Sequence, residues 1–101
     1  MRDLKLFSLT LAREIMPESE PFLQFGEPPK GGAGLKIPSI PPGRYLFSQW
    51  AESDFPDPVD GLVAMRGRAE QEGRKTRGPW ILRCVAEDGK RVWQGLRELE
   101  P

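Results

Sequence analysis

The side chains of this chain that could do chemistry are mostly aromatic. Tyr45, Phe47 and Trp50 lie within one six-residue stretch, and Trp80 and Trp93 follow further along. A tyrosine works as a general acid or base only where neighbouring groups shift its acidity in a pocket with little water. The spacing places no carboxylate next to Tyr45, so we predict no catalytic residue. Core filling and the lining of a ligand pocket both stay open for these rings.

The absence of histidine and the presence of a single cysteine exclude further kinds of catalytic and metal-binding site. The chain has no histidine, which removes the commonest general base and the commonest metal ligand. Cys84 is the only cysteine, so an intramolecular disulfide is impossible. We interpret Cys84 as a small buried hydrophobe, because a reactive thiol needs a basic and accessible pocket. We expect neither a metal nor a cofactor.

Net charge and hydropathy limit the kinds of partner that the protein is expected to bind. Fifteen Lys and Arg residues balance fifteen Asp and Glu residues, so no long-range field draws the surface to nucleic acid or to an anionic membrane. Charges interrupt the first residues, and no apolar run approaches the ~20 residues that span a bilayer. We therefore expect a cytoplasmic protein without a nucleic-acid or membrane partner.

Length and composition predict one small domain built of short elements. A chain of 101 residues has the size of a single domain. Eleven Gly and eleven Pro residues imply many turns, which favours strands over long helices. We predict an α+β fold: a mainly antiparallel sheet with one principal helix. Residues 1–37 would form N-terminal strands and a loop, and residues 38–101 a strand–helix–strand–strand module.

The N-terminal part is predicted to begin with a hairpin. Residues 4–15 mix period-two and continuous apolar character, which suits a strand, and Phe22–Phe25 resumes the pattern after a break. Residues 26–34 are rich in glycine but lack the Gly-Lys-Ser/Thr ending of a phosphate-binding loop. We expect a mobile surface loop there, followed by a short strand at Leu35–Ile37.

A central strand is predicted over residues 44–50. Three prolines in residues 38–42 remove amide donors and keep that segment outside the sheet ladder. From residue 44 onward, Tyr45 and Phe47 alternate with Leu46 and Trp50, so both faces carry apolar groups. We expect a helix over one face and a loop, a partner or a ligand over the other.

One helix is predicted over residues 58–72. Asp57 suits the N-cap, and Pro58 suits the first helical position. Gly61 and Gly67 each cost about 1 kcal/mol relative to Ala, so tertiary contacts must stabilise the helix. Its apolar stripe consists of Val59, Leu62, Val63, Met65 and Ala69. A basic cluster near its end either stabilises the helix dipole or forms an anion or acidic-partner site: Arg66, Arg68, Arg74, Lys75 and Arg77.

The C-terminal third is predicted to form a second hairpin. Asp88-Gly89 is the preferred dipeptide of a two-residue type I′ turn, and residues 80–87 and 90–97 flank it. With that turn, the facing pairs are Glu87 with Lys90, Val85 with Val92, Cys84 with Trp93, and Ile81 with Leu96.

Residues 40–47, Ile-Pro-Pro-Gly-Arg-Tyr-Leu-Phe, and the order of elements after them resemble the first half of the GyrI-like effector-binding family. Members bind small, often cationic or aromatic compounds between two such modules, through aromatic side chains and an acidic residue. The resemblance implies a groove lined by Tyr45, Phe47, Trp50, Trp80 or Trp93. The candidates for the acidic residue are Glu52, Glu87 and Glu98.

A single-module variant of that family needs a second wall for its groove. The N-terminal hairpin or a second copy of the chain would supply it, which implies a possible homodimer. We therefore expect a non-enzymatic module that binds an apolar or cationic small molecule. The alternatives are a protein-interaction or homodimerisation module and a small hydrolase, since some relatives hydrolyse small electrophiles with a tyrosine and a glutamate.

Overall fold

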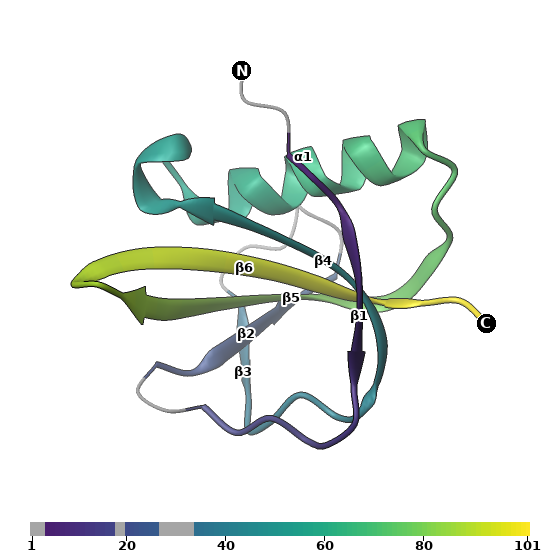
Figure 1. The fold of residues 1–101 in the computed structure, drawn as a ribbon, viewed down its shortest axis with the longest axis horizontal. Coiled ribbons are helices and arrows are strands. Elements are labelled where there is room, and N and C mark those ends of the chain that lie inside the picture. The colour runs from purple at the N-terminus through teal and green to yellow at the C-terminus, as the bar shows by residue number, and fades with distance from the viewer. Residues whose placement is uncertain (1–3, 18–19, 27–33) are drawn as a thin grey trace.

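The elements range in length from 3 to 14 residues, so the short elements that the many prolines and glycines predict make up only part of the fold. The computed structural model describes residues 4–17, 20–26 and 34–101, and Figure 1 shows a curved sheet with a helix across one face. In chain order the elements are β1 (Phe7–Leu11), β2 (Phe22–Phe25), β3 (Leu35–Ile37), β4 (Gly43–Ala51), the 3₁₀ turn η1 (Glu52–Asp54), α1 (Pro58–Gln71), β5 (Thr76–Glu87) and β6 (Lys90–Leu99).

The six strands form one antiparallel sheet in the order β1-β4-β6-β5-β2-β3. The predicted α+β class, with a mainly antiparallel sheet and one principal helix, is confirmed. Elements β4, α1, β5 and β6 follow in the predicted order of strand, helix, strand, strand. Within the sheet, β6 lies between β4 and β5, so the last strand returns to the centre.

The predicted hairpin between residues 4–15 and Phe22–Phe25 is wrong. The first segment forms only the short strand β1, which pairs with β4 at one edge, whereas β2 pairs with β5 and β3 near the other edge. Leu9 lies opposite Tyr45, so β1 extends an apolar face that β4 already presents. Matching of apolar faces outweighs the small extra entropy cost of closing a longer loop. The N-terminal part does contain an antiparallel pair, formed by β2 and β3.

The second predicted hairpin is confirmed in register. Strands β5 and β6 pair Glu87 with Lys90 and Cys84 with Trp93, and the two other predicted pairs also form. Asp88 and Gly89 have φ values of 51° and 74°, which is the left-handed backbone that a type I′ turn requires at both central positions.

The helix begins and ends close to its predicted bounds. The Asp57 carboxylate accepts a hydrogen bond from the backbone N–H of Val59 at 2.9 Å, and Pro58 occupies the first turn. The last residue of α1 is Gln71, with Glu72 as its C-cap. Leu62, Met65 and Ala69 of the predicted stripe are buried, and Val59 packs against the same core.

The face of the sheet under α1 holds the larger core. Its fully buried side chains include Leu46, Leu62, Met65 and Trp80. Trp50 of β4 lies against Gly61 of α1 and Gly95 of β6, where a Cβ on either glycine would meet the indole ring at 3.0 Å or less. Two glycines on different elements therefore make room for one large ring.

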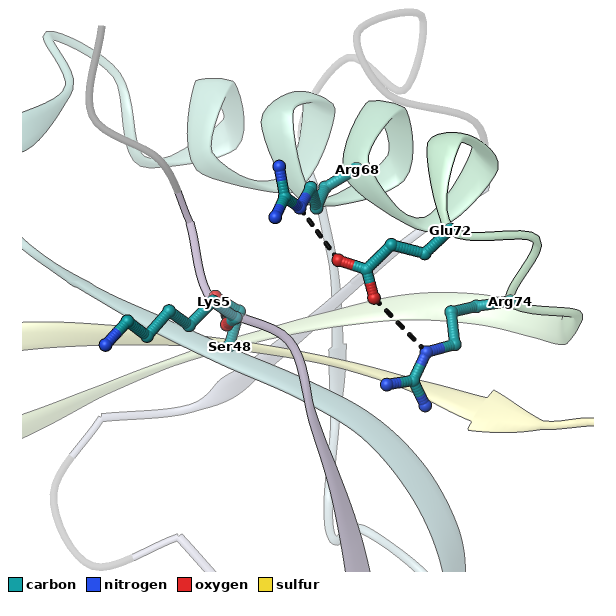
Figure 2. Close-up of polar contacts among 5 residues, drawn as sticks. All are labelled: Lys5, Ser48, Arg68, Glu72 and Arg74. Atoms are coloured by element: carbon teal, nitrogen blue, oxygen red, sulfur yellow. Dashed lines mark hydrogen bonds and ion pairs between the residues drawn. The ribbon is translucent and has the colours of Figure 1, made fainter.

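A buried hydroxyl ties the start of the chain to this face. Ser48 of β4 is completely buried, and its Oγ donates a hydrogen bond to the backbone carbonyl of Lys5 at 2.9 Å; Figure 2 shows the two residues together. Leu4 joins the core beside them. The segment before β1 thus lies on the helix side of the sheet.

The opposite face of the sheet is covered in part by the chain itself. Ile40 is completely buried, and its backbone exchanges two 2.9 Å hydrogen bonds with Ile15. The cluster beneath them consists of Phe22, Tyr45, Ile81 and Leu96. The sequence left a loop, a partner or a ligand as possible covers of this face. Over the cluster around Tyr45, the structure shows a loop that contains Ile40.

The structure bears only in part on the predicted glycine loop and on the expected absence of a membrane span. Most of the predicted glycine loop, residues 27–33, lies outside the described residues, so its character stays a prediction. In the described part of the chain, no helix combines the length and the apolar character that crossing a bilayer requires.

Candidate ligand-binding site

The sheet separates the five aromatic residues that the sequence singles out. Tyr45 and Phe47 belong to the cluster on the face of the sheet opposite α1, whereas Trp50, Trp80 and Trp93 belong to the core beneath α1. Side chains alternate between faces along a strand, which places residue 50 opposite residues 45 and 47. The structure therefore does not bring all five rings into one groove.

The three tryptophans lie in or against the helix-side core. Trp50 and Trp80 are almost fully buried, and Trp93 is partly buried against the same cluster. Trp50 also meets Phe55 edge-on, with ring centres 6.1 Å apart. None of the three indole N–H groups reaches an acceptor in the described part of the chain. Their surroundings fit core filling, one of the two interpretations left open by the sequence.

Tyr45 lies beside a cavity of about 290 Å³ on the other face. Only 4% of Tyr45 is exposed, and its hydroxyl donates a hydrogen bond to the backbone carbonyl of Pro41 at 2.8 Å. Six of the lining residues are apolar or aromatic: Ile37, Pro38, Pro41, Tyr45, Pro79 and Ile81. The polar lining comes from Gln24, Ser39 and Glu98. The proline-rich entry to β4 thus forms part of the wall.

Glu98 is the acidic residue that the structure places at this cavity. In the sheet it lies between Tyr45 of β4 and Arg77 of β5, and Arg77 donates a 2.9 Å hydrogen bond from Nη2 to its Oε1. Both partners of this ion pair are about half exposed, so solvent screens it and leaves it weak. The carboxylate of Glu98 therefore lines the cavity, and its ion pair with Arg77 is weak enough for a ligand to replace.

The other two acidic candidates lie elsewhere. Glu87 faces Lys90 beside the β5–β6 turn, and Glu52 forms an ion pair with Arg91 at 3.6 Å. The signal that distinguishes Glu98 is the β4–β6 register. That register joins strands separated by a helix and a third strand, which local patterns in the sequence do not specify.

Burial raises the pKa of the Tyr45 phenol above its ordinary value of 10.0, and the negative charge of Glu98 adds to the shift. Both effects disfavour the tyrosinate anion. A phenol with a raised pKa, donating to a backbone carbonyl, is poorly prepared to act as a general base near neutral pH.

We expect the Tyr45 phenol to titrate above pH 10 in the folded protein and near 10 in denaturant. Because folding keeps the phenol protonated, its contribution to stability is complete below the unfolded pKa and is lost as pH rises through the folded pKa. Tyr45 is the only tyrosine in the chain, so absorbance of the tyrosinate anion reports it alone. Identical titration curves with and without denaturant would contradict the burial of this ring.

A bulge in β5 shapes one wall of the cavity. The β5–β6 register shifts between Arg77 and Ile81, where Gly78 has a φ of 80° and Pro79 follows. Proline cannot donate to the ladder, and glycine permits the left-handed backbone. The bulge directs Pro79 into the lining of the cavity. The sequence pattern predicts the strand but not this irregularity.

Carboxylates already neutralise part of the predicted basic cluster. Glu72 accepts a hydrogen bond from Nε of Arg68 at 2.7 Å and lies 3.4 Å from Nε of Arg74; Figure 2 shows Glu72 between the two guanidinium groups. The hydrogen bond from Arg68 is the main cause of the lowered pKa of Glu72. Arg77 is engaged by Glu98 in the same way, so the cluster is not a set of free cations.

Neither a search for metal-binding clusters in the described residues nor comparison with known proteins identifies another site. Among residues 4–17, 20–26 and 34–101, no group of three or more Cys, Asp or Glu side chains is placed to hold a metal ion. Comparison of the chain with protein-family models, curated proteins and solved structures found no match. The interpretation of the site therefore depends on its geometry.

Proposed function

We propose that this protein binds a small molecule with an apolar body and a cationic group in the cavity beside Tyr45, without chemistry of its own. The observation that carries the proposal is the pairing of apolar walls with one carboxylate, Glu98, around about 290 Å³ of space. Ligand sites characteristically combine an apolar lining with a few polar groups that orient the ligand.

The size and chemistry of the cavity define the ligand further. Pockets for drug-sized ligands have volumes of about 300–1,000 Å³, so a cavity of about 290 Å³ fits a compound with one ring. A charge-assisted hydrogen bond to Glu98 would hold an ammonium group at the rim. The resemblance of residues 40–47 to GyrI-like effector-binding proteins supports the same ligand class, with Tyr45 and Glu98 as the aromatic and acidic contacts.

Arg77 competes with such a ligand for Glu98. We expect benzylammonium to bind more tightly than uncharged benzyl alcohol, and Glu98→Gln to abolish the difference. Arg77→Gln should raise the affinity for benzylammonium by up to about fivefold, since an exposed ion pair is worth at most about 1 kcal/mol. Amide chemical-shift titration measures the affinities and locates the site.

Glu52→Gln is the control for this experiment, because Glu52 pairs with Arg91 away from the cavity and its loss should leave both affinities unchanged. Shifts at Tyr45 and Ile81 would locate the ligand in the cavity. Binding without shifts at these two residues, or equal affinities of the wild-type protein for the two compounds, would count against the proposal.

Pairing of two copies is the second candidate function. Phe7 on the edge strand β1 is 50% exposed, and its ring centre lies 6.3 Å from that of Phe47. An edge strand offers free backbone groups to a further strand, and these rings would supply apolar contact. Light scattering of the wild-type chain distinguishes a dimer from a monomer.

A further inference from the structure

A second cavity lies at the end of α1, on the face of the sheet opposite the Tyr45 site. Its volume is about 380 Å³, and its lining comes from α1, the connection to β5, and the outer ends of β5 and β6. Four cations contribute to this lining: Arg66, Arg74, Lys75 and Arg97. Glu70 and Glu100 are the two acidic lining residues.

Arg97 is held in place by neutral groups. Its guanidinium lies 4.8 Å from the ring centre of the fully buried Trp80. Nε donates to the carbonyl of Gly78 at 2.9 Å, and Nη1 donates to Oγ1 of Thr76 at 3.2 Å. In the described part of the chain, no carboxylate pairs with Arg97 and no acceptor reaches its Nη2. Its positive charge is therefore oriented and partly buried, yet uncompensated.

Fully buried charges in proteins are characteristically paired, and Arg97 is only partly buried. Arg74, in contrast to Arg97, shares Glu72 with Arg68, as Figure 2 shows. Lys75 also has no acidic partner among the described residues. Arg97 and Lys75 are thus two cations of this cavity for which the described residues show no ion pair.

The end of a helix carries partial negative charge, which disfavours anions. Here the final turn is already satisfied, because the backbone N–H groups of Gly73 and Arg74 donate to the carbonyls of Glu70 and Ala69. Those carbonyls are neutral dipoles with bonded partners, whereas the guanidinium and ammonium groups carry full charges. The cations therefore outweigh the helix end.

We propose that this cavity binds a small organic dianion, with Arg97 and Lys75 as its charged contacts. Phosphate monoesters and aromatic dicarboxylates share this chemistry. The guanidinium of Arg97 presents Nη2 for a charge-assisted hydrogen bond to a phosphate or carboxylate oxygen. The volume of about 380 Å³ accommodates an organic group in addition to the charged one. The proposal does not rest on a ligand beside Tyr45, because the two cavities share no lining residue.

Calorimetric titration with phenyl phosphate and with phthalate tests the proposal. We expect Arg97→Gln to weaken binding about tenfold or more, since a hydrogen bond to a charged group is worth about 1.5–3 kcal/mol. Lys75→Gln should weaken it several-fold and lower its salt dependence. Lys36→Gln, which removes an exposed cation on the edge strand β3, should change nothing. The stronger of the two probes identifies the anionic group of the ligand class.

Arg97→Gln can lower stability, because it removes two hydrogen bonds and the contact with Trp80. Thermal unfolding of each variant therefore accompanies the titration, and Lys75→Gln, at an exposed position, decides the question if Arg97→Gln does not fold. Binding of both probes unchanged by Lys75→Gln, or no binding of either probe at millimolar concentration, would overturn the proposal.

Discussion

Gly61→Ala is expected to destabilise the protein by about 3 kcal/mol, the upper part of the range for an overpacked core. A Cβ on Gly61 would lie 2.1 Å from Cε2 and 2.3 Å from Cζ2 of Trp50. Both atoms belong to a rigid ring that Gly95 confines from the sheet side. Either α1 must move away from the sheet or Trp50 must leave its position. Urea unfolding followed by circular dichroism measures the loss.

Gly67→Ala is the matched control for that variant, because it makes the same change in the same helix. A Cβ on Gly67 meets no atom within 4 Å. Alanine is the better helix former, so this substitution should stabilise the protein by about 0.5–1 kcal/mol. A similar loss of stability in both variants would show that contact with Trp50 is not the reason for glycine at position 61.

Ile40→Ala is expected to cost about 2–5 kcal/mol, as for other fully buried aliphatic residues. Ile40 lies outside the strands, yet it is completely buried and joined to Ile15 by two backbone hydrogen bonds. The cost arises because the truncated side chain leaves a void above Tyr45 and its neighbours. The free energy of unfolding in urea measures it.

Leu35→Ala provides the comparison, because Leu35 is another large aliphatic residue of the N-terminal half but is 66% exposed. Its removal should change the free energy of unfolding by no more than about 0.5 kcal/mol. Were Ile40→Ala as mild as Leu35→Ala, residues 38–42 could not be the cover over this face of the sheet.

Local signals in the sequence predicted the helix and the β5–β6 hairpin well. Asp57 and Pro58 specify the start of α1 through capping and fixed torsion. Asp88-Gly89 specifies the turn and the register of the two strands as far as the pair of Ile81 and Leu96. In each case the information lies within a few adjacent residues, so no distant part of the chain is needed to interpret it.

The same signals failed where pairing is long-range. Apolar alternation correctly marked β1 and β2 as extended, but it does not say which strand each will join. The partner of β1 is β4, more than thirty residues away, and the bridge between Ile15 and Ile40 joins residues 25 positions apart. These choices depend on which faces remain open after the central strands have formed.

The candidate site shows the same limit. The sequence singled out Tyr45, which lines a cavity in the structure, and it left Glu98 as one of three candidates. The β4–β6 register is what places Glu98 beside Tyr45. The contact between Gly61 and Trp50 could not be predicted for a related reason. Helix propensity describes glycine only as destabilising. Its benefit appears once Trp50 is in place.

The division of aromatic residues between the two faces makes each side of the sheet separately observable. All three tryptophans of the chain belong to the core beneath α1, and its one tyrosine belongs to the opposite cluster. Indole fluorescence therefore monitors one side, and tyrosinate absorbance at alkaline pH monitors the other, without an added label. If the two signals change at the same urea concentration, both halves melt as one cooperative unit. Separate midpoints would show that the layer around Tyr45 opens on its own.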